Sequence, residues 1–98
     1  MIDIKVLKSQ LDLVAVVQAC GVSLKRKGTN YFALCVFHTE STPSLSVNPR
    51  TQLFHCFGCG TGGDVFRFVE RYYGIRFGAA VAKLNAMLAG SPELRRAS

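Results

Sequence analysis

The stretch 35-CVFHTESTPSLSVNPRTQLFHCFGCGTGG-63 decides how this chain folds. It holds two pairs of metal-ligating residue types, Cys35 with His38 and Cys56 with Cys59, and two residues separate the members of each pair. Seventeen residues lie between the pairs. Two such pairs brought together by a returning hairpin are typical of a tetrahedral zinc site with three thiolates and one imidazole. We therefore predict that all four side chains bind one Zn²⁺ ion.

The predicted zinc ion is structural, because four protein ligands leave no coordination position open for water. A chain of 98 residues buries a modest core, and small domains commonly gain stability from a metal. His55 is the competing imidazole, but it precedes Cys56 in a predicted strand, where neighbouring side chains point to opposite faces. His55 is therefore expected to point away from the metal, either as a surface residue or as a contact to nucleic acid.

The composition favours an anionic partner. Lysine and arginine number 12 against 6 acidic residues, which gives a formal charge of +6. Three thiolates and a neutral histidine around Zn²⁺ carry about −1, so the zinc-bound domain is nearer to about +5. A basic excess of this kind is typical of proteins that bind nucleic acid.

The sequence gives no sign of a membrane or secretory protein. It has no apolar run near 18 residues, and its first ten residues contain charged side chains instead of a continuous apolar segment. The cysteines fall in metal-ligand pairs, apart from Cys20 on an apolar helical stripe, where we expect a buried small side chain. We predict no membrane contact and a reducing, cytoplasmic location.

Helical periodicity appears at both ends of the chain. Apolar residues recur at three- and four-residue steps in 3–20, which predicts a short first helix or turn and then a helix over about 12–20. Asp12 is a candidate N-cap, and Ser9 with Asp12 is an alternative capping box. The same periodicity predicts a helix between Asp64 and Gly74 and a last helix over about 78–88.

The central part alternates with a period of two, which predicts antiparallel strands at 31–35, 44–48 and 52–56. In the middle strand Leu45 and Val47 share one face, and the serines and asparagine share the other, so one side of the sheet is expected to face water. The predicted fold is α+β: a small zinc ribbon with an antiparallel sheet of three or more strands, flanked by N-terminal and C-terminal helices. We expect one domain over 1–90 and a disordered tail over 91–98.

Cations and aromatic residues lie close together in the sequence after the first helices. Lys25, Arg26 and Lys27 come shortly before Tyr31 and Phe32. Positive charge beside a stacking surface is what single-stranded nucleic acid requires, although a run of charge is also typical of a solvated loop.

The full set of side chains predicted to contact nucleic acid is Lys25, Arg26, Lys27, Tyr31, Arg50, Phe54, His55, Arg67 and Arg71. Core packing is the alternative for every aromatic residue. We expect it for Phe57, Phe66 and Phe68, and it stays open for Tyr31 and Phe54.

A family resemblance is carried by Asn30-Tyr31, Leu34-Cys35-Val36-Phe37-His38, Glu40, Thr42-Pro43-Ser44, Val47, His55-Cys56-Phe57-Gly58-Cys59-Gly60 and Gly62-Gly63-Asp64. These residues closely resemble the CHC2-type zinc finger of bacterial and phage DNA primases, over roughly 12–88. The resemblance implies a zinc ribbon that binds single-stranded template DNA and helps to select where an RNA primer starts. It also implies a primase polymerase module or a replicative helicase as partner.

The polymerising chemistry of that family resides in a separate module with clustered acidic metal ligands, and the acidic residues of this chain are scattered. No other catalytic constellation is present in the sequence, so we predict no catalytic residues. The alternative function is a zinc ribbon that docks on a replication, transcription or transposition partner through its helices. An exposed apolar helix face favours that alternative, and cations beside exposed aromatics on the sheet favour nucleic acid.

Overall fold

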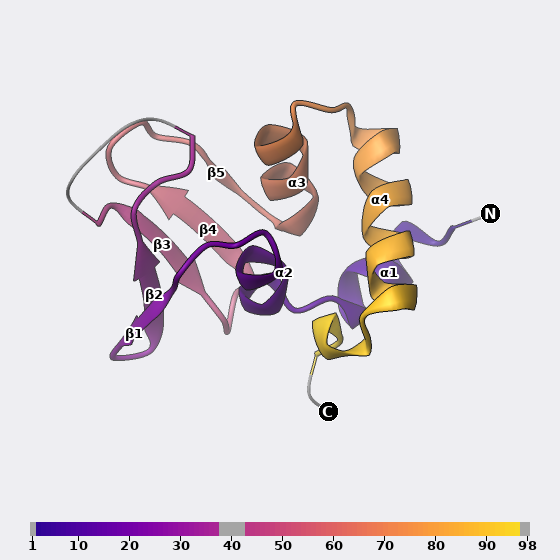
Figure 1. The fold of residues 1–98 in the computed structure, drawn as a ribbon, viewed down its shortest axis with the longest axis horizontal. Coiled ribbons are helices and arrows are strands. Elements are labelled where there is room, and N and C mark those ends of the chain that lie inside the picture. The colour runs from indigo at the N-terminus through magenta and orange to yellow at the C-terminus, as the bar shows by residue number, and fades with distance from the viewer. Residues whose placement is uncertain (1, 38–42, 97–98) are drawn as a thin grey trace.

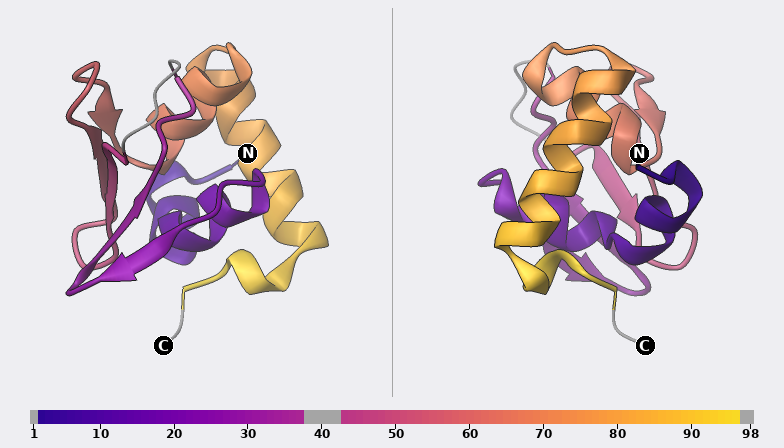
Figure 2. Two further views of the ribbon diagram at one scale, coloured as in Figure 1. Left: turned by 60° about the vertical axis from the view of Figure 1, so that its left-hand side comes forward. Right: turned by 90° about the vertical axis from the view of Figure 1, so that its right-hand side faces the viewer.

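A five-stranded antiparallel sheet forms one side of the molecule, and helices cover one of its faces (Figures 1 and 2). This arrangement is seen in a computed structural model that describes residues 2–37 and 43–96. The strands follow one another in space as they do in the chain: β1 Lys25–Lys27, β2 Asn30–Ala33, β3 Leu45–Asn48, β4 Leu53–Cys56 and β5 Gly62–Gly63. The predicted α+β class and flanked antiparallel sheet are confirmed.

The three strands expected from the sequence are β2, β3 and β4, each within two residues of its predicted bounds. The other two strands, β1 and β5, show no alternation of apolar and polar residues that would have predicted them. β1 consists of three cations where a loop was expected, and β5 consists of two glycines. Both are added at the edges of the sheet by backbone pairing, which requires no apolar side chain.

Four α-helices and one 3₁₀ helix complete the described chain: α1 Ile4–Gln10, α2 Leu13–Ala19, α3 Val65–Tyr73, α4 Phe77–Gly90 and η1 Pro92–Leu94. α3 begins as predicted, because the Asp64 carboxylate accepts a hydrogen bond from the Arg67 N–H at 3.0 Å. It ends as predicted at Gly74, which has the left-handed conformation, with φ +65°.

The start of α2 differs from expectation. Asp12 occupies the N-cap position, but its side chain makes no capping bond. The Gln52 side chain accepts the Leu13 N–H instead, at 2.6 Å. Ser9 lies in the last turn of α1, where its hydroxyl donates to the Val6 carbonyl at 2.7 Å, so it forms no capping box.

The core lies between the helices and the covered face of the sheet. Three phenylalanine rings meet there: Phe54 of β4 lies 5.4 Å from Phe68 of α3 between ring centroids, and Phe37 lies 5.8 Å and 5.6 Å from these two rings. The predicted core packing of Phe66 and Phe68 is confirmed, since both are buried. Cys20 is half-buried at the end of α2, and its sulfur lies 3.8 Å from the Tyr73 hydroxyl.

The expected disordered tail is wrong for the residues that the structure describes there. Leu94 is only 2% exposed and belongs to the core. The Asp12 N–H donates to the Leu94 carbonyl at 2.8 Å, and the Arg96 N–H donates to the Gln10 carbonyl at 2.8 Å. The mostly polar composition of 91–98 gave no indication that Leu94 packs in the core. Ala97 and Ser98 lie outside the described residues.

Within the described residues, no helix combines the length and the apolar character needed to cross a membrane.

Candidate metal centre and nucleic-acid interface

Three cysteine sulfurs converge at one end of the sheet. Cys35 follows β2, Cys56 ends β4, and Cys59 lies in the turn after β4. Their Sγ atoms all lie within 4.8 Å of one another, and those of Cys35 and Cys59 are 4.0 Å apart. Sulfurs bound tetrahedrally to zinc at about 2.3 Å lie about 3.8 Å apart. The three side chains therefore fit one ion.

Polar groups surround the sulfurs. The Phe37 N–H donates to Cys35 Sγ at 3.3 Å, the Ser44 hydroxyl lies 3.4 Å from Cys56 Sγ, and the Thr61 hydroxyl lies 3.3 Å from Cys59 Sγ. Such outer contacts orient metal ligands and favour the thiolate form.

These contacts change the thiol pKa values. Burial opposes ionisation of Cys56, but hydrogen bonds from Ser44 and from the Cys59 backbone outweigh it and lower the pKa to about 7. The Thr61 contacts lower the pKa of Cys59. Burial raises the pKa of Cys35 to about 12. A divalent cation is what allows three adjacent sulfurs to ionise together.

The fourth predicted ligand, His38, lies outside the described residues. The competing imidazole behaves as the strand pattern predicts, because His55 is exposed while Cys56 beside it is buried. The His55 ring meets the Phe57 ring edge-on, with centroids 4.8 Å apart. His55 thus points to the face of the sheet opposite the core.

Cross-strand pairing defines that opposite face, which we call the outer face. Lys25, Phe32, Ser46, His55 and Gly62 are paired in sequence across all five strands, so they form one row on it.

A second row lies two residues further along each strand and therefore shares the outer face. In this row Lys27 pairs with Asn30, and Asn48 pairs with Leu53. Ser46, expected to face water, is nevertheless buried between its neighbours in the first row.

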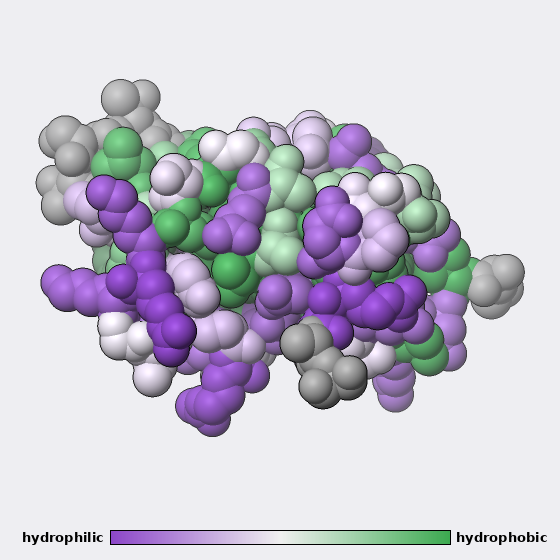
Figure 3. Space-filling view, turned by 60° about the horizontal axis from the view of Figure 1, so that its bottom comes forward, coloured by the Kyte–Doolittle hydropathy of each residue, from purple (hydrophilic) through white to green (hydrophobic). Residues whose placement is uncertain are grey.

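The outer face carries two of the three predicted cations of the basic segment. Lys25 and Lys27 belong to its rows, and Arg26 alternates to the other side, although all three are exposed. Together with Phe32 and Pro43 they line a hollow of about 790 Å³. Figure 3 shows hydrophilic side chains projecting from the left of the view, at the end of the sheet where β1 lies.

The structure differs most from the sequence-based expectations in where it places the aromatic side chains. Phe54 was predicted to contact nucleic acid, but it is 2% exposed and packs in the ring cluster described above, so stacking on a base is excluded in this fold. Tyr31 is half-buried in the row that faces the core, and its neighbour Phe32 lies on the outer face. Phe57, expected in the core, is 70% exposed. Cys56 and Cys59, which flank this residue in the chain, turn toward the metal site, and the Phe57 ring stays in solvent.

The remaining predicted cations lie elsewhere. Arg50 is exposed in the turn between β3 and β4, where its N–H donates to Asn48 Oδ1 at 2.9 Å. Arg67 and Arg71 lie on α3, which packs against the covered face of the sheet, and so they do not extend the outer face.

One residue of the outer face was missed in the sequence. Asn30 lines a hollow of about 370 Å³ with Ser46, Asn48 and His55, and its Oδ1 atom is buried with no hydrogen-bond partner among the described residues. A buried acceptor without a donor is costly. The signal was the polar face of β3, where Ser46 and Asn48 alternate with apolar residues, but alternation alone assigned that face to solvent.

The comparisons with known proteins agree with this geometry. A model of the CHC2 zinc finger family matches residues 2–96. The DNA primase of Geobacillus stearothermophilus is 49% identical over 83 residues, which cover 85% of this chain and 14% of the primase. That of Thermotoga maritima is 43% identical over 81 residues, or 83% of this chain and 14% of the primase.

A crystal structure of the Aquifex aeolicus primase, containing its zinc-binding and RNA polymerase domains, matches 100% of this chain with a TM-score of 0.84 and 35% identity. The match covers 23% of that primase structure. The three sulfurs, the family match and this fold identify the metal as zinc, as predicted. This chain belongs to the CHC2 zinc finger family and is a zinc-binding domain of the DNA primase type.

Proposed function

We propose that this domain holds single-stranded template DNA against the outer face of its sheet and thereby helps to set where a primase begins an RNA primer. One observation carries the proposal: strand register places Lys25, Phe32, Asn30 and His55 together on an exposed face that no helix of the described chain covers. The zinc ion fixes this sheet end and performs no chemistry. The polymerase that would use the bound template belongs to a separate module.

The chemistry of the face suits a single strand better than a duplex. Lysines at the β1 edge provide charge for phosphates, while Phe32 and the His55–Phe57 pair offer rings on which bases stack. The unpartnered Asn30 acceptor suits an exocyclic amine of a base, whose two N–H groups are both free only when the base is unpaired.

A titration of fluorescent oligonucleotides into the zinc-loaded chain tests this proposal. We expect single strands to bind more tightly than duplexes, with an affinity that falls as salt rises, because phosphate contacts release counterions. The double reversal Lys25→Glu with Lys27→Glu should weaken binding at least about tenfold, since each reversal replaces attraction by repulsion.

The matched control is Lys5→Glu with Arg76→Glu, two exposed cations outside the sheet that produce the same change in net charge. Equal losses in both double variants would show that only overall charge matters and would overturn the assignment to the outer face. Salt-independent binding would contradict it as well.

A second candidate function is docking on a protein partner, such as a primase polymerase module or a replicative helicase. It is favoured by α1, where Ile4 is 41% exposed and Val6 is 49% exposed. Substituting both by lysine should weaken binding to such a partner and leave the oligonucleotide titration unchanged.

A further inference from the structure

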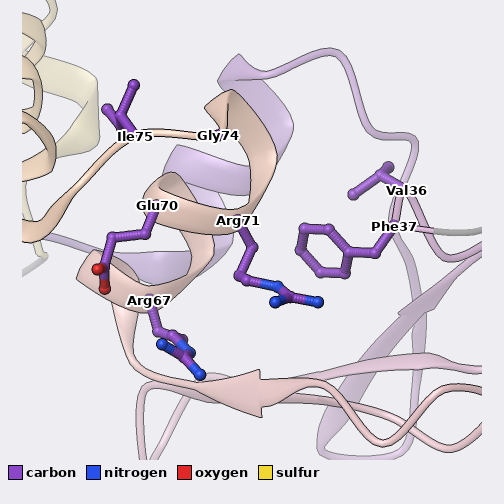
Figure 4. A pocket seen from close by; sticks show the side chains of 7 residues that line it. All are labelled: Val36, Phe37, Arg67, Glu70, Arg71, Gly74 and Ile75. Carbon is purple, nitrogen blue, oxygen red and sulfur yellow. The ribbon is translucent and has the colours of Figure 1, made fainter.

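A second basic hollow lies next to the metal site and away from the outer face. It has a volume of about 440 Å³ and opens between α3 and the segment that follows Cys35. Val36 and Phe37 give it an apolar wall on one side, and Arg67 and Arg71 give it two positive charges (Figure 4). Glu70, Gly74 and Ile75 complete its lining. Sites of this size and mixed character are typical of small-molecule binding.

The two arginines are arranged as a pair. They are four positions apart in the chain, so they lie one above the other on the same side of α3. Figure 4 shows the Arg71 side chain extending toward Phe37, with Arg67 one turn away, whereas the Glu70 side chain leaves the helix in another direction. Among residues 2–37 and 43–96 neither arginine forms an ion pair, whereas Lys8 pairs with Asp64.

The backbone holds Arg67 in place. A methyl group at Gly63 would lie 2.7 Å from both Cβ and Cγ of Arg67, so the stem of this side chain runs directly against β5. Asp64 caps the first turn of α3 and fixes the helix on which both arginines stand. Two guanidinium groups on one side of a capped helix, neither ion-paired among the described residues, offer donors for phosphate oxygens.

The hollow is separate from the proposed template surface. α3 packs through Phe68 against Phe54, which points to the covered side of β4, while His55 points to the other side. A single strand lying flat on the outer face therefore does not reach both arginines without passing around the edge of the sheet at β5.

We propose that this hollow binds a phosphorylated nucleotide, with Arg67 and Arg71 on the phosphates and the sugar or base against Val36 and Phe37. The nucleotide has two chemically equivalent sources: a free nucleoside triphosphate, or a phosphorylated end of a bound strand. Because the site is distinct from the outer face, this proposal does not depend on the template proposal.

The test uses the zinc-loaded 98-residue chain, titrated with ATP, with GTP, with adenosine and with a 5′-phosphorylated trinucleotide, followed by NMR chemical shifts. We expect ATP or the trinucleotide to shift the resonances of 36–37 and 67–75, and adenosine to leave them unchanged. Arg67→Ala and Arg71→Ala should each weaken binding about tenfold, the effect of removing one charge-assisted contact. The control Arg76→Ala, an exposed arginine outside the hollow, should bind as the parent does.

The two sources are separated by which probe binds in an arginine-dependent way. The proposal would be overturned if neither ATP nor the trinucleotide binds, or if adenosine binds as tightly as ATP. It would also be overturned if Arg76→Ala loses as much affinity as the Arg67 and Arg71 variants. Zinc content and circular dichroism of each variant establish that it is folded. The double reversal at Lys25 and Lys27 should leave this site unchanged, so a negative result here is distinguishable from a negative result at the outer face.

Discussion

At the scale of single residues, Gln52 shows how a turn residue can organise a distant helix. It is only 8% exposed and has a positive φ of 59°, which is uncommon outside glycine. Its side-chain oxygen accepts the Leu13 N–H at 2.6 Å, and its nitrogen donates to Asp12 Oδ1 at 3.1 Å and to the Pro49 carbonyl at 2.8 Å. One amide therefore joins the β3–β4 turn to the start of α2.

Replacing Gln52 by alanine should lower the free energy of unfolding by about 1–3 kcal/mol, because the Leu13 N–H would stay buried without an acceptor. Urea denaturation of the zinc-loaded protein measures the change. Gln18→Ala is the matched control, since this glutamine is exposed on the same helix and should change stability by less than about 0.5 kcal/mol. Equal stability of the Gln52 variant and its parent would contradict the capping role.

At the scale of elements, the C-terminal segment closes the helical layer. η1 brings Leu94 into the core, and the chain then pairs with Leu11 through an antiparallel bridge at Arg95. The Arg96 guanidinium donates to the Leu11 carbonyl at 2.6 Å and to the Lys8 carbonyl at 3.1 Å, which satisfies acceptors at the end of α1. The segment thus connects the first two helices to α4.

Leu94→Ala should lower the free energy of unfolding by about 2–5 kcal/mol, as expected for a leucine removed from a core. Thermal or urea unfolding measures this loss. Glu93→Ala, at an exposed position of the same short helix, should leave stability nearly unchanged. If both variants unfold at the same temperature or urea concentration as the parent, the packing of η1 does not contribute to stability in solution.

At the scale of the whole molecule, the zinc ion and the apolar core stabilise adjoining parts of one sheet. The core cluster runs from Leu7 to Leu94, and two of the sulfur ligands, Cys35 and Cys56, are buried within it. Loss of the ion would leave three adjacent sulfurs, two of them buried, with no counter-charge.

Removing zinc with a chelator should therefore unfold the domain. A structural zinc site contributes on the order of 10 kcal/mol, comparable with the whole stability of a small domain. Circular dichroism and the melting temperature, measured with zinc analysis, follow the change. A native melt of metal-free protein would contradict it.

The same measurement identifies the fourth ligand. We expect His38→Ala to lose zinc and stability, whereas His55→Ala should keep one zinc ion per chain because His55 points to the outer face. Zinc loss in the His55 variant alone would reverse the assignment.

The sequence by itself determined the ligand spacing, the three central strands and the capped helix after the second cysteine pair, since these features depend on local periodicity and turn chemistry. It also determined which histidine points away from the cysteines, because strand neighbours alternate between faces. Only the tertiary structure decided that Phe54 is buried and Phe57 exposed, that Gln52 caps α2, and that Arg67 and Arg71 line a hollow of their own. These outcomes depend on which face the helices cover and on contacts between residues far apart in the chain, and periodicity contains no information about either.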